Sequence, residues 1–233
     1  MRRLFGVILG VSLLIAGTSG SFAGIGIHLG IDTTPIKETS ESFVFKNDIQ
    51  LSQNLTSLNR QKSGMPLNVG VDLTFTMLPI VDLQVSVESA FSKYTVDVTS
   101  AVLNAQSVHD KSIPYLRLGA DASALIGLGS FPKVIKLFKP FIGGGVSVHA
   151  FGPVVSRELL MDHLNSATEE IKPEDYVDIE PKFGFHLLFG TKIKPPAIPI
   201  GFRVTGKYYI FTGQEADTPE NFLTVQGGIY LGG

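Results

Sequence analysis

The sequence contains neither cysteine nor tryptophan. Without cysteine, the chain can form no disulfide framework and offers no thiolate ligand to a metal. After Ala23 no stretch approaches about 18 uninterrupted apolar residues, which excludes a membrane-spanning helix from that part of the chain. Basic residues are not in excess either, because 19 Lys and Arg stand against 21 Asp and Glu, and this balance argues against a nucleic-acid partner. Any membrane location would therefore have to come from β-strands.

The N-terminus has the features of a secretory signal peptide. Two arginines precede an apolar run from Leu4 to Ala16, and small residues then lead to the triplet Ser21-Phe22-Ala23, a small-x-small cleavage pattern. The apolar run of about thirteen residues is shorter than the roughly 20 that a spanning helix needs. We therefore expect residues 1–23 to be a signal peptide and residues 24–233 to form one domain. Loss of the two arginines leaves 17 basic and 21 acidic side chains, a formal net charge of −4.

The clearest structural signal is a hairpin pattern between Leu67 and Phe91. Its first arm reads LNVGVDLTFTM, with an apolar residue at every second position, and its second arm, VDLQVSVESAF, repeats the alternation. A period of two predicts β-strands, and Leu78-Pro79-Ile80 supplies the turn. The pattern alone does not say which face is buried. A soluble sandwich turns its apolar face inward, whereas a membrane barrel turns it toward lipid.

Eight segments of the chain carry this alternation. They are the two hairpin arms and Gly24–Ile31, Ile113–Ile126, Phe138–Phe151, Ile179–Thr191, Ile198–Phe211 and Phe222–Leu231. The connections between them alternate in length, because long polar stretches follow the first, third, fifth and seventh segments and shorter links follow the others. Up-and-down barrels of the outer membrane have this parity, with short periplasmic turns and longer extracellular loops.

Charge follows the same parity as connection length. The shorter links contain lysine and no acidic residue, whereas the stretches Gly152–Asp178 and Thr212–Asn221 together hold ten carboxylates against two basic residues. The rim at the long connections is therefore expected to be acidic. Within the first of these two stretches, Ser156–Glu170 has apolar residues at helical spacing and predicts a short surface helix.

If the apolar face meets lipid, the ionisable residues of the strands point into the lumen. The interior of an eight-stranded barrel is just wide enough to be filled by side chains, and buried charges persist only when they are paired. We therefore expect a lumen charge network and not an open channel. Its expected members are Asp72, Glu88, Arg117, Asp121, His149, Lys182, His186, Arg203 and Lys207.

Aromatic residues gather near the ends of the apolar segments, where outer-membrane barrels carry aromatic girdles. The candidates for such girdles are Tyr94, Tyr115, Phe138, Phe141, Tyr208, Tyr209, Phe211, Phe222 and Tyr230.

No motif indicates a catalytic, cofactor-binding or metal site. The five histidines lie on separate strands and loops without a close ligand pair. The glycines from Gly24 to Gly30 are spaced wrongly for a dinucleotide fingerprint, and no helix follows them. Ser147 and His149 share a strand face, with Asp178 or Glu180 as a possible third member of a hydrolase site, but that face points into the lumen. We therefore expect no enzymatic activity, no cofactor and no metal.

The signal peptide, the eight alternating strands, the connection parity and the ionisable lumen together resemble the small outer-membrane barrels of the OmpA/OmpX type. The resemblance implies an all-β fold, an eight-stranded antiparallel up-and-down transmembrane β-barrel, with both termini in the periplasm. It also implies contact with outer-membrane lipid and lipopolysaccharide and assembly by the outer-membrane insertion machinery. We expect a monomer.

Three functions fit this reading of the sequence. The leading hypothesis is a non-enzymatic outer-membrane barrel with a structural or surface-interaction role. The second is a narrow pore or conduit for a small or hydrophobic molecule, resembling the OmpW type. The third is a lipid-modifying barrel enzyme. A soluble secreted sandwich remains as the alternative fold.

Overall fold

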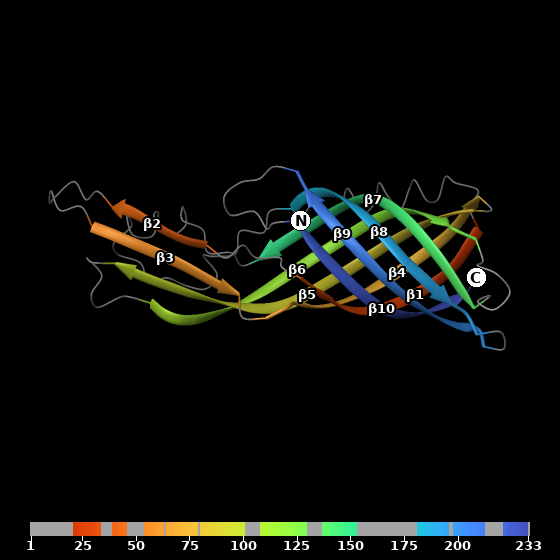
Figure 1. Ribbon diagram of the computed structural model, residues 1–233, viewed down its shortest axis with the longest axis horizontal. Helices are drawn as coiled ribbons and strands as arrows, with labels where there is room; N and C mark the ends of the chain where they lie inside the picture. Colours follow the sequence, from red (N-terminus) through yellow and green to blue (C-terminus); the bar gives the residue numbers. More distant parts are fainter. Residues whose placement is uncertain are drawn as a thin grey trace.

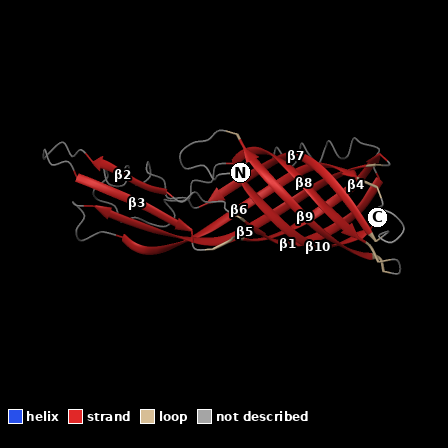
Figure 2. Ribbon diagram, viewed as in Figure 1, coloured by secondary structure: helices blue, strands red, loops and turns tan. Residues whose placement is uncertain are grey.

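A computed structural model describes residues 21–33, 39–45, 54–62, 64–78, 80–100, 108–129, 137–152, 181–195, 198–212 and 221–232. Every regular element in these ranges is a β-strand (Figure 2). The described residues include no helix with the length and apolar character needed to cross a bilayer. The strands are β1 (Ser21–Asp32), β2 (Thr39–Phe45), β3 (Asn54–Lys62), β4 (Leu67–Leu78), β5 (Val81–Ser100), β6 (Val108–Gly127), β7 (Phe138–Gly152), β8 (Pro181–Ile193), β9 (Ile200–Phe211) and β10 (Phe222–Gly232).

Eight of these strands close into a barrel (Figure 1). Around the wall the order is β5-β4-β1-β10-β9-β8-β7-β6, and β6 pairs back onto β5, so the sheet has no free edge within the barrel. All pairings are antiparallel. The prediction of an all-β, eight-stranded, antiparallel up-and-down barrel is therefore confirmed, and the alternative of a sandwich is wrong.

The hairpin that dominates the sequence forms one section of the wall. β4 and β5 pair from Leu67↔Phe91 to Leu78↔Val81, with an irregularity between Thr76 and Leu78. The wall closes where the first and last barrel strands meet, from Gly24↔Gly232 to Asp32↔Thr224. Both ends of the described chain therefore contribute to one seam, between β1 and β10.

The two faces of the wall have opposite character. On β4, Asn68 and Asp72 are buried, whereas the alternate residues Val69 and Val71 are exposed. On β8, the aromatic side chains of Phe183 and Phe185 are both more than half exposed. A strand alternates its side chains between the two faces, so the barrel encloses the polar face and presents the apolar one.

One part of the sheet projects beyond the barrel. β5 and β6 are each 20 residues long, whereas the other barrel strands have 11 to 15 residues. β3 pairs with the distal half of β5 along Thr56↔Ser100 to Lys62↔Tyr94, and β2 pairs with β3. These four strands form a sheet that extends from one end of the barrel (Figure 1).

The projecting sheet corrects the sequence analysis at two points. The predicted segments Leu67–Phe91 and Ile113–Ile126 stop short of the ends of β5 and β6, and β2 and β3 lie in what was interpreted as one long polar connection. β3 reads NLTSLNRQK, which has no alternating apolar face. The periodicity that identifies the barrel strands is therefore missing from this strand.

Some predicted segments lie outside the described residues. They are most of the signal peptide, the surface helix over Ser156–Glu170, and the acidic stretches of the long connections.

Glycines at inward positions of the barrel allow neighbouring strands to approach closely. A Cβ built on Gly145 would lie 1.9 Å from the carbonyl oxygen of Ala122 on β6, whereas a Cβ on Gly227, an exposed position of β10, would meet nothing within 4 Å. We expect Gly145→Ala to lower the free energy of unfolding by about 1–3 kcal/mol, because the added methyl forces β6 and β7 apart.

Urea unfolding of the barrel refolded in detergent measures this difference. Gly227→Ala is the matched control and should change the free energy of unfolding by less than about 0.5 kcal/mol. Equal effects of the two substitutions would contradict the close approach of β6 and β7 at Gly145.

Candidate functional site

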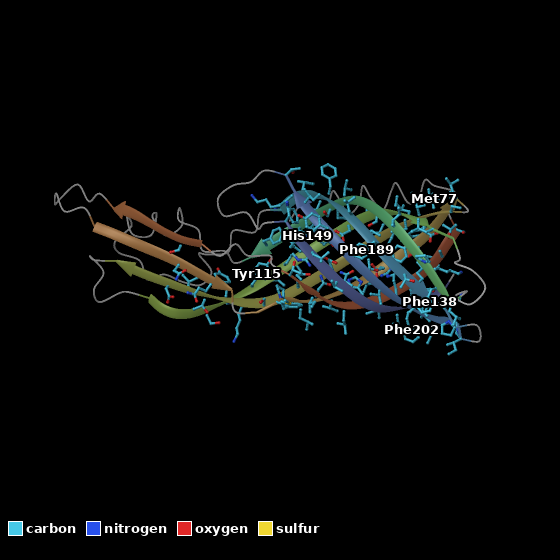
Figure 3. All side chains as sticks on the ribbon, in the orientation of Figure 1. Met77, Tyr115, Phe138, His149, Phe189 and Phe202 are labelled. Carbon is cyan, nitrogen blue, oxygen red and sulfur yellow. The ribbon has the colours of Figure 1, made fainter. Side chains whose placement is uncertain are left out.

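The enclosed face of the barrel is the candidate site, because it brings together ionisable side chains from every part of the wall. We call the end from which the projecting sheet extends the long-connection end, and the end where β4 meets β5 at Leu78 and Val81 the short-turn end. Tyr115 and His149 lie toward the long-connection end, and Met77, Phe138 and Phe202 lie toward the short-turn end (Figure 3).

Arg117, on β6, is the centre of the network nearest the long-connection end. Its side chain is fully buried. Nη1 donates to Glu88 Oε1 at 2.5 Å and lies 2.8 Å from His149 Nδ1, while Nε and Nη2 lie 3.1 and 2.8 Å from Asp32 Oδ2. One guanidinium therefore connects β1, β5, β6 and β7, in the forked geometry that suits two carboxylates.

Lys207, on β9, holds a second pair of carboxylates together. Its Nζ lies 2.9 Å from Asp121 Oδ2 and 3.6 Å from Glu88 Oε2. The Tyr209 hydroxyl lies 2.7 Å from the same Asp121 oxygen and 3.1 Å from Glu88 Oε1. Glu88 also accepts a hydrogen bond of 2.8 Å from Gln226 Nε2. The Glu88 carboxylate therefore contacts both cations, Arg117 and Lys207.

Asp72, on β4, is the third centre and lies against different partners. Its Oδ1 accepts hydrogen bonds from Gln84 Nε2 at 2.5 Å and from Ser86 Oγ at 2.6 Å. Its Oδ2 forms an ion pair with Arg203 and lies 2.9 Å from His28 Nδ1. Every buried charge in these three centres therefore has an oppositely charged partner, as enclosure in a low-dielectric interior requires.

The long-connection end of the interior is lined by aromatic rings. Phe151 and Phe211 lie edge to face at 5.4 Å, and Phe211 and Phe222 stack at 5.7 Å between ring centroids. The Arg117 guanidinium carbon lies 4.9 Å from the Phe222 centroid, within cation–π distance. Aromatic rings thus cover the outer side of the first charge centre.

Burial of their side chains corrects the girdle hypothesis for six residues. Tyr94, Tyr115, Phe141, Tyr209, Phe211 and Phe222 are buried, and only Phe138 and Tyr208 among the candidates are clearly exposed. The reason is parity, since side chains alternate between the two faces of a strand, and outward-facing neighbours such as Ile210 and Ile142 are exposed. Position near a strand end was not sufficient to assign the face.

The short-turn end is filled in a different way. Leu125, Phe141 and Leu188 form a buried apolar cluster there. Beside it, Lys192 Nζ lies 3.1 Å from Asp82 Oδ2, and Thr76 donates to Asp82 at 2.9 Å. This pair is partly exposed and joins β8 to β5 across the barrel.

The structure places the nine predicted network residues as follows. Asp72, Glu88, Arg117, Asp121, His149, His186, Arg203 and Lys207 are buried, and Lys182 is half-buried opposite His149 in the β7–β8 register. Oppositely charged members meet as Glu88–Arg117, Asp121–Lys207 and Asp72–Arg203. His186 instead lies 2.8 Å from the Ser123 hydroxyl.

Sequence reasoning missed several members of the network. Asp32 contacts Arg117 and accepts a 2.8 Å hydrogen bond from Thr224, yet it was assigned to a loop because the predicted strand stopped at Ile31. Continuing the alternation by one residue would have placed Asp32 inward. His28 was placed on the inward face but not among the network residues, and Tyr209 was assigned to a girdle.

Three donors in the network have the geometry of a possible metal site. One ligand atom from each of Glu88, Asp121 and His149 lies within 4.8 Å of the others. The spacing of these residues along three strands gave no such signal. Arg117 and Lys207 already contact the two carboxylates, so these two side chains supply the positive charge that a metal ion would supply there.

The hydrolase hypothesis depends on Ser147 and His149. His149 Nδ1 lies 2.8 Å from Arg117 Nη1, and its Nε2 lies 3.2 Å from Asp121 Oδ1, so both ring nitrogens are engaged. The Ser147 hydroxyl is buried and has no hydrogen-bond partner among the described residues. The structure therefore does not pair this serine with this histidine as nucleophile and base, and residues 178 and 180 lie outside the described ranges.

The chain was compared with known proteins. No protein-family model matches it, and neither does any curated protein. Among solved structures it is similar to the outer membrane protein OprG from Pseudomonas aeruginosa, with a TM-score of 0.42 and 15% identity over 93% of this chain and 96% of that one. The closed eight-stranded architecture, established by the strand pairings above, is that of the small OmpA/OmpX-type barrels that the sequence resembles.

We expect Arg117→Ala to be strongly destabilising, because it leaves Asp32 and Glu88 buried without their main cation. Breaking a buried ion pair by removing one partner costs about 3–5 kcal/mol. Urea unfolding in detergent measures this loss. The exposed Lys139→Ala serves as the control and should change stability by less than about 0.5 kcal/mol. A similar small effect of Arg117→Ala would mean that the guanidinium does not hold the network together.

Proposed function

We propose that this protein is a non-enzymatic outer-membrane β-barrel of a Gram-negative envelope, with a side-chain-filled lumen and a structural or surface-interaction role. The observation that carries the proposal is the inversion of polarity across the wall, with apolar residues exposed and ionisable residues enclosed. A soluble protein with this arrangement would expose apolar surface around its whole circumference, which monomeric soluble proteins rarely do.

The exposed apolar residues come from all eight barrel strands. One such residue from each strand in turn is Ile27, Val71, Val87, Leu118, Val146, Phe185, Val204 and Val225. Barrel strands of 11 or more residues also meet the length that a tilted strand needs to cross the hydrocarbon core, about 9–11 residues. Together these features support a band of lipid contact around the barrel.

The direction of insertion follows from the connections. In outer-membrane barrels the short turns face the periplasm and the long loops face outward. By this rule the short-turn end of the barrel faces the periplasm, and the projecting sheet of β2, β3, β5 and β6 stands outside the cell. The signal-peptide pattern at the N-terminus supports export across the inner membrane. The partners of such a protein are outer-membrane lipid, lipopolysaccharide and the insertion machinery, and we propose a monomer.

The filled interior supports a plugged lumen over a conduit. Aromatic rings occupy the long-connection end, three charge centres occupy the middle, and an apolar cluster with the Asp82–Lys192 pair occupies the short-turn end. An eight-stranded barrel has little interior volume beyond what side chains fill. The engaged nitrogens of His149 likewise favour a non-enzymatic role.

We expect Val71→Arg to lower the free energy of unfolding by about 2–4 kcal/mol in lipid vesicles, because the valine is exposed on the proposed lipid face. Denaturant unfolding of the vesicle-inserted protein measures the loss. Ser112→Arg is the matched control, since Ser112 is exposed on β6 beyond the barrel and should tolerate arginine at about 0–1 kcal/mol. Near-zero cost at Val71 would argue that this face does not contact lipid.

A plugged lumen predicts no single-channel conductance. Purified, refolded protein is added to a planar bilayer, and heat-modifiable migration on a gel verifies that the same sample contains folded barrel. We expect no stepwise current. Reproducible single-channel steps from folded protein would favour the narrow conduit instead, while leaving the membrane location intact.

A further inference from the structure

The fully buried charges of the lumen do not balance if only permanently charged residues are counted. Among the described residues, four carboxylates are buried there, those of Asp32, Asp72, Glu88 and Asp121. The buried cations that carry a fixed charge are three, Arg117, Arg203 and Lys207. The partly exposed Asp82–Lys192 pair at the short-turn end is neutral by itself. Lys182, half-buried opposite His149, is a fourth cation on the inward face. The fully buried set by itself has one negative charge more than it has fixed cations, and one further buried cation would balance it.

His28 occupies the position that such a cation would take. Its imidazole is buried on β1 between two carboxylates, with Nδ1 2.9 Å from Asp72 Oδ2 and Nε2 3.7 Å from Glu88 Oε2. The Nδ1–H donates to Asp72, because a carboxylate can only accept. The Nε2 atom then faces Glu88 and has no hydrogen-bond donor among the described residues.

The state of Nε2 follows from what it faces. A neutral ring with its proton on Nδ1 would direct the Nε2 lone pair toward a carboxylate, which is repulsive. A protonated Nε2 would direct an N–H toward the same oxygen, which is attractive at this distance. The two neighbouring carboxylates therefore favour the doubly protonated ring.

The other two buried histidines have different surroundings. Arg117 Nη1 lies against His149 Nδ1, and a guanidinium can only donate, so Nδ1 must accept and the ring is neutral. His186 Nε2 lies against the Ser123 hydroxyl, and no carboxylate lies within ion-pair distance of its ring among the described residues. Of the three rings, only that of His28 bridges two carboxylates.

We propose that His28 is an imidazolium that balances the fully buried charges of the lumen and makes the stability of the filled interior sensitive to pH. Protonated, it joins β1 to Asp72 on β4 and Glu88 on β5. Deprotonated, it leaves Asp72 and Glu88 without the cation that lies between them beside the seam of the barrel. This inference rests on the filled lumen of the proposed function, but not on the membrane location.

The groups packed around His28 come from each neighbouring strand. β4 supplies Asp72, with Gly70 against the ring, and β5 supplies Glu88. From β9, Arg203 pairs with Asp72 and Lys207 lies 3.6 Å from Glu88, and β10 contributes the uncharged Gln226 to Glu88. On β1 itself, Asp32 is paired with Arg117 of β6. Arg203 and Lys207 of β9 do not titrate below about pH 9, and a buried neutral ring such as that of His149 changes its protonation on unfolding only below about pH 7.5. A change in stability between about pH 7.5 and pH 9 therefore reports on His28.

Nitrogen NMR of the histidine rings tests the charge directly in the wild-type protein. The barrel is labelled at the ring nitrogens and folded in detergent micelles, and the His28 signals are assigned by their loss in His28→Gln. At about pH 7 we expect two protonated ring nitrogens for His28 and one for His149. If His28→Gln fails to fold, the His28 signals are assigned by through-bond experiments instead. With either assignment, a singly protonated His28 ring would overturn the proposal.

Stability against pH tests the consequence. The midpoint urea concentration of the wild type should fall between about pH 7.5 and pH 9, and that of His28→Gln should start lower and stay constant over this window, because glutamine carries no proton to lose. His149→Gln, the matched control, should keep the fall of the wild type over the same window, because a neutral histidine carries no proton to lose there. Equal pH dependence in wild type and His28→Gln would refute the proposal. Failure of lipid insertion, by contrast, would leave both results unaffected and would refute only the membrane location.

Discussion

The structure depends on one constraint, that an eight-stranded sheet closed on itself must fill its interior with its own side chains. Because strands alternate their side chains, the enclosed set is half of every barrel strand, and in this sequence that half is rich in charge. A charge inside the wall has lost water, so it needs a partner from another strand. Arg117 shows how this is met, since one guanidinium serves Asp32 from β1, Glu88 from β5 and His149 from β7. The network is thus the consequence of closure acting on an ionisable face.

The same alternation determines the outer surface. Residues that stand between the buried charges, such as Val71 beside Asp72 and Val87 beside Glu88, are directed outward and remain exposed. The apolar band and the polar interior are therefore one pattern seen from two sides. Glycine makes this arrangement possible at crowded positions. Gly70 lies against the His28 ring, where even a methyl group would approach Nε2 to 2.5 Å, and so gives the imidazole room between β4 and β5.

The barrel could be predicted from the sequence because its information is local and repeated. The arms Leu67–Met77 and Val81–Phe91 alternate except at Ser89 and Ala90, and a one-residue slip would reverse every face, so the register was strongly specified. The partners of each charge could not be predicted, since Arg117 and Asp32 are 85 residues apart and meet only across the lumen. The ends of the strands could not be predicted from the alternation either. Asp32 and the distal half of β6 continue their strands after the apolar alternation ends, and β3 has none. In the distal half of β5 the alternation returns with the opposite parity, since Tyr94 and Val96 are buried. Pairing with neighbouring strands therefore determines these positions.

The seam of the barrel shows why closure and the charge network are inseparable. β1 and β10 are joined along the wall from Gly24↔Gly232 to Asp32↔Thr224. Inside the wall, β1 supplies Asp32 to Arg117 and His28 to Asp72, and β10 supplies Gln226 to Glu88. Before these two strands meet, β9 and β10 lie at the opposite end of the sheet from β4 and β5, so Asp72 lacks Arg203 and Glu88 lacks Gln226. Once they meet, Thr224 of β10 also donates to Asp32 of β1, so a side-chain hydrogen bond crosses the seam itself. Pairing of β1 with β10 and these contacts of the network therefore require each other, which gives the closed barrel an advantage over any open sheet of the same strands.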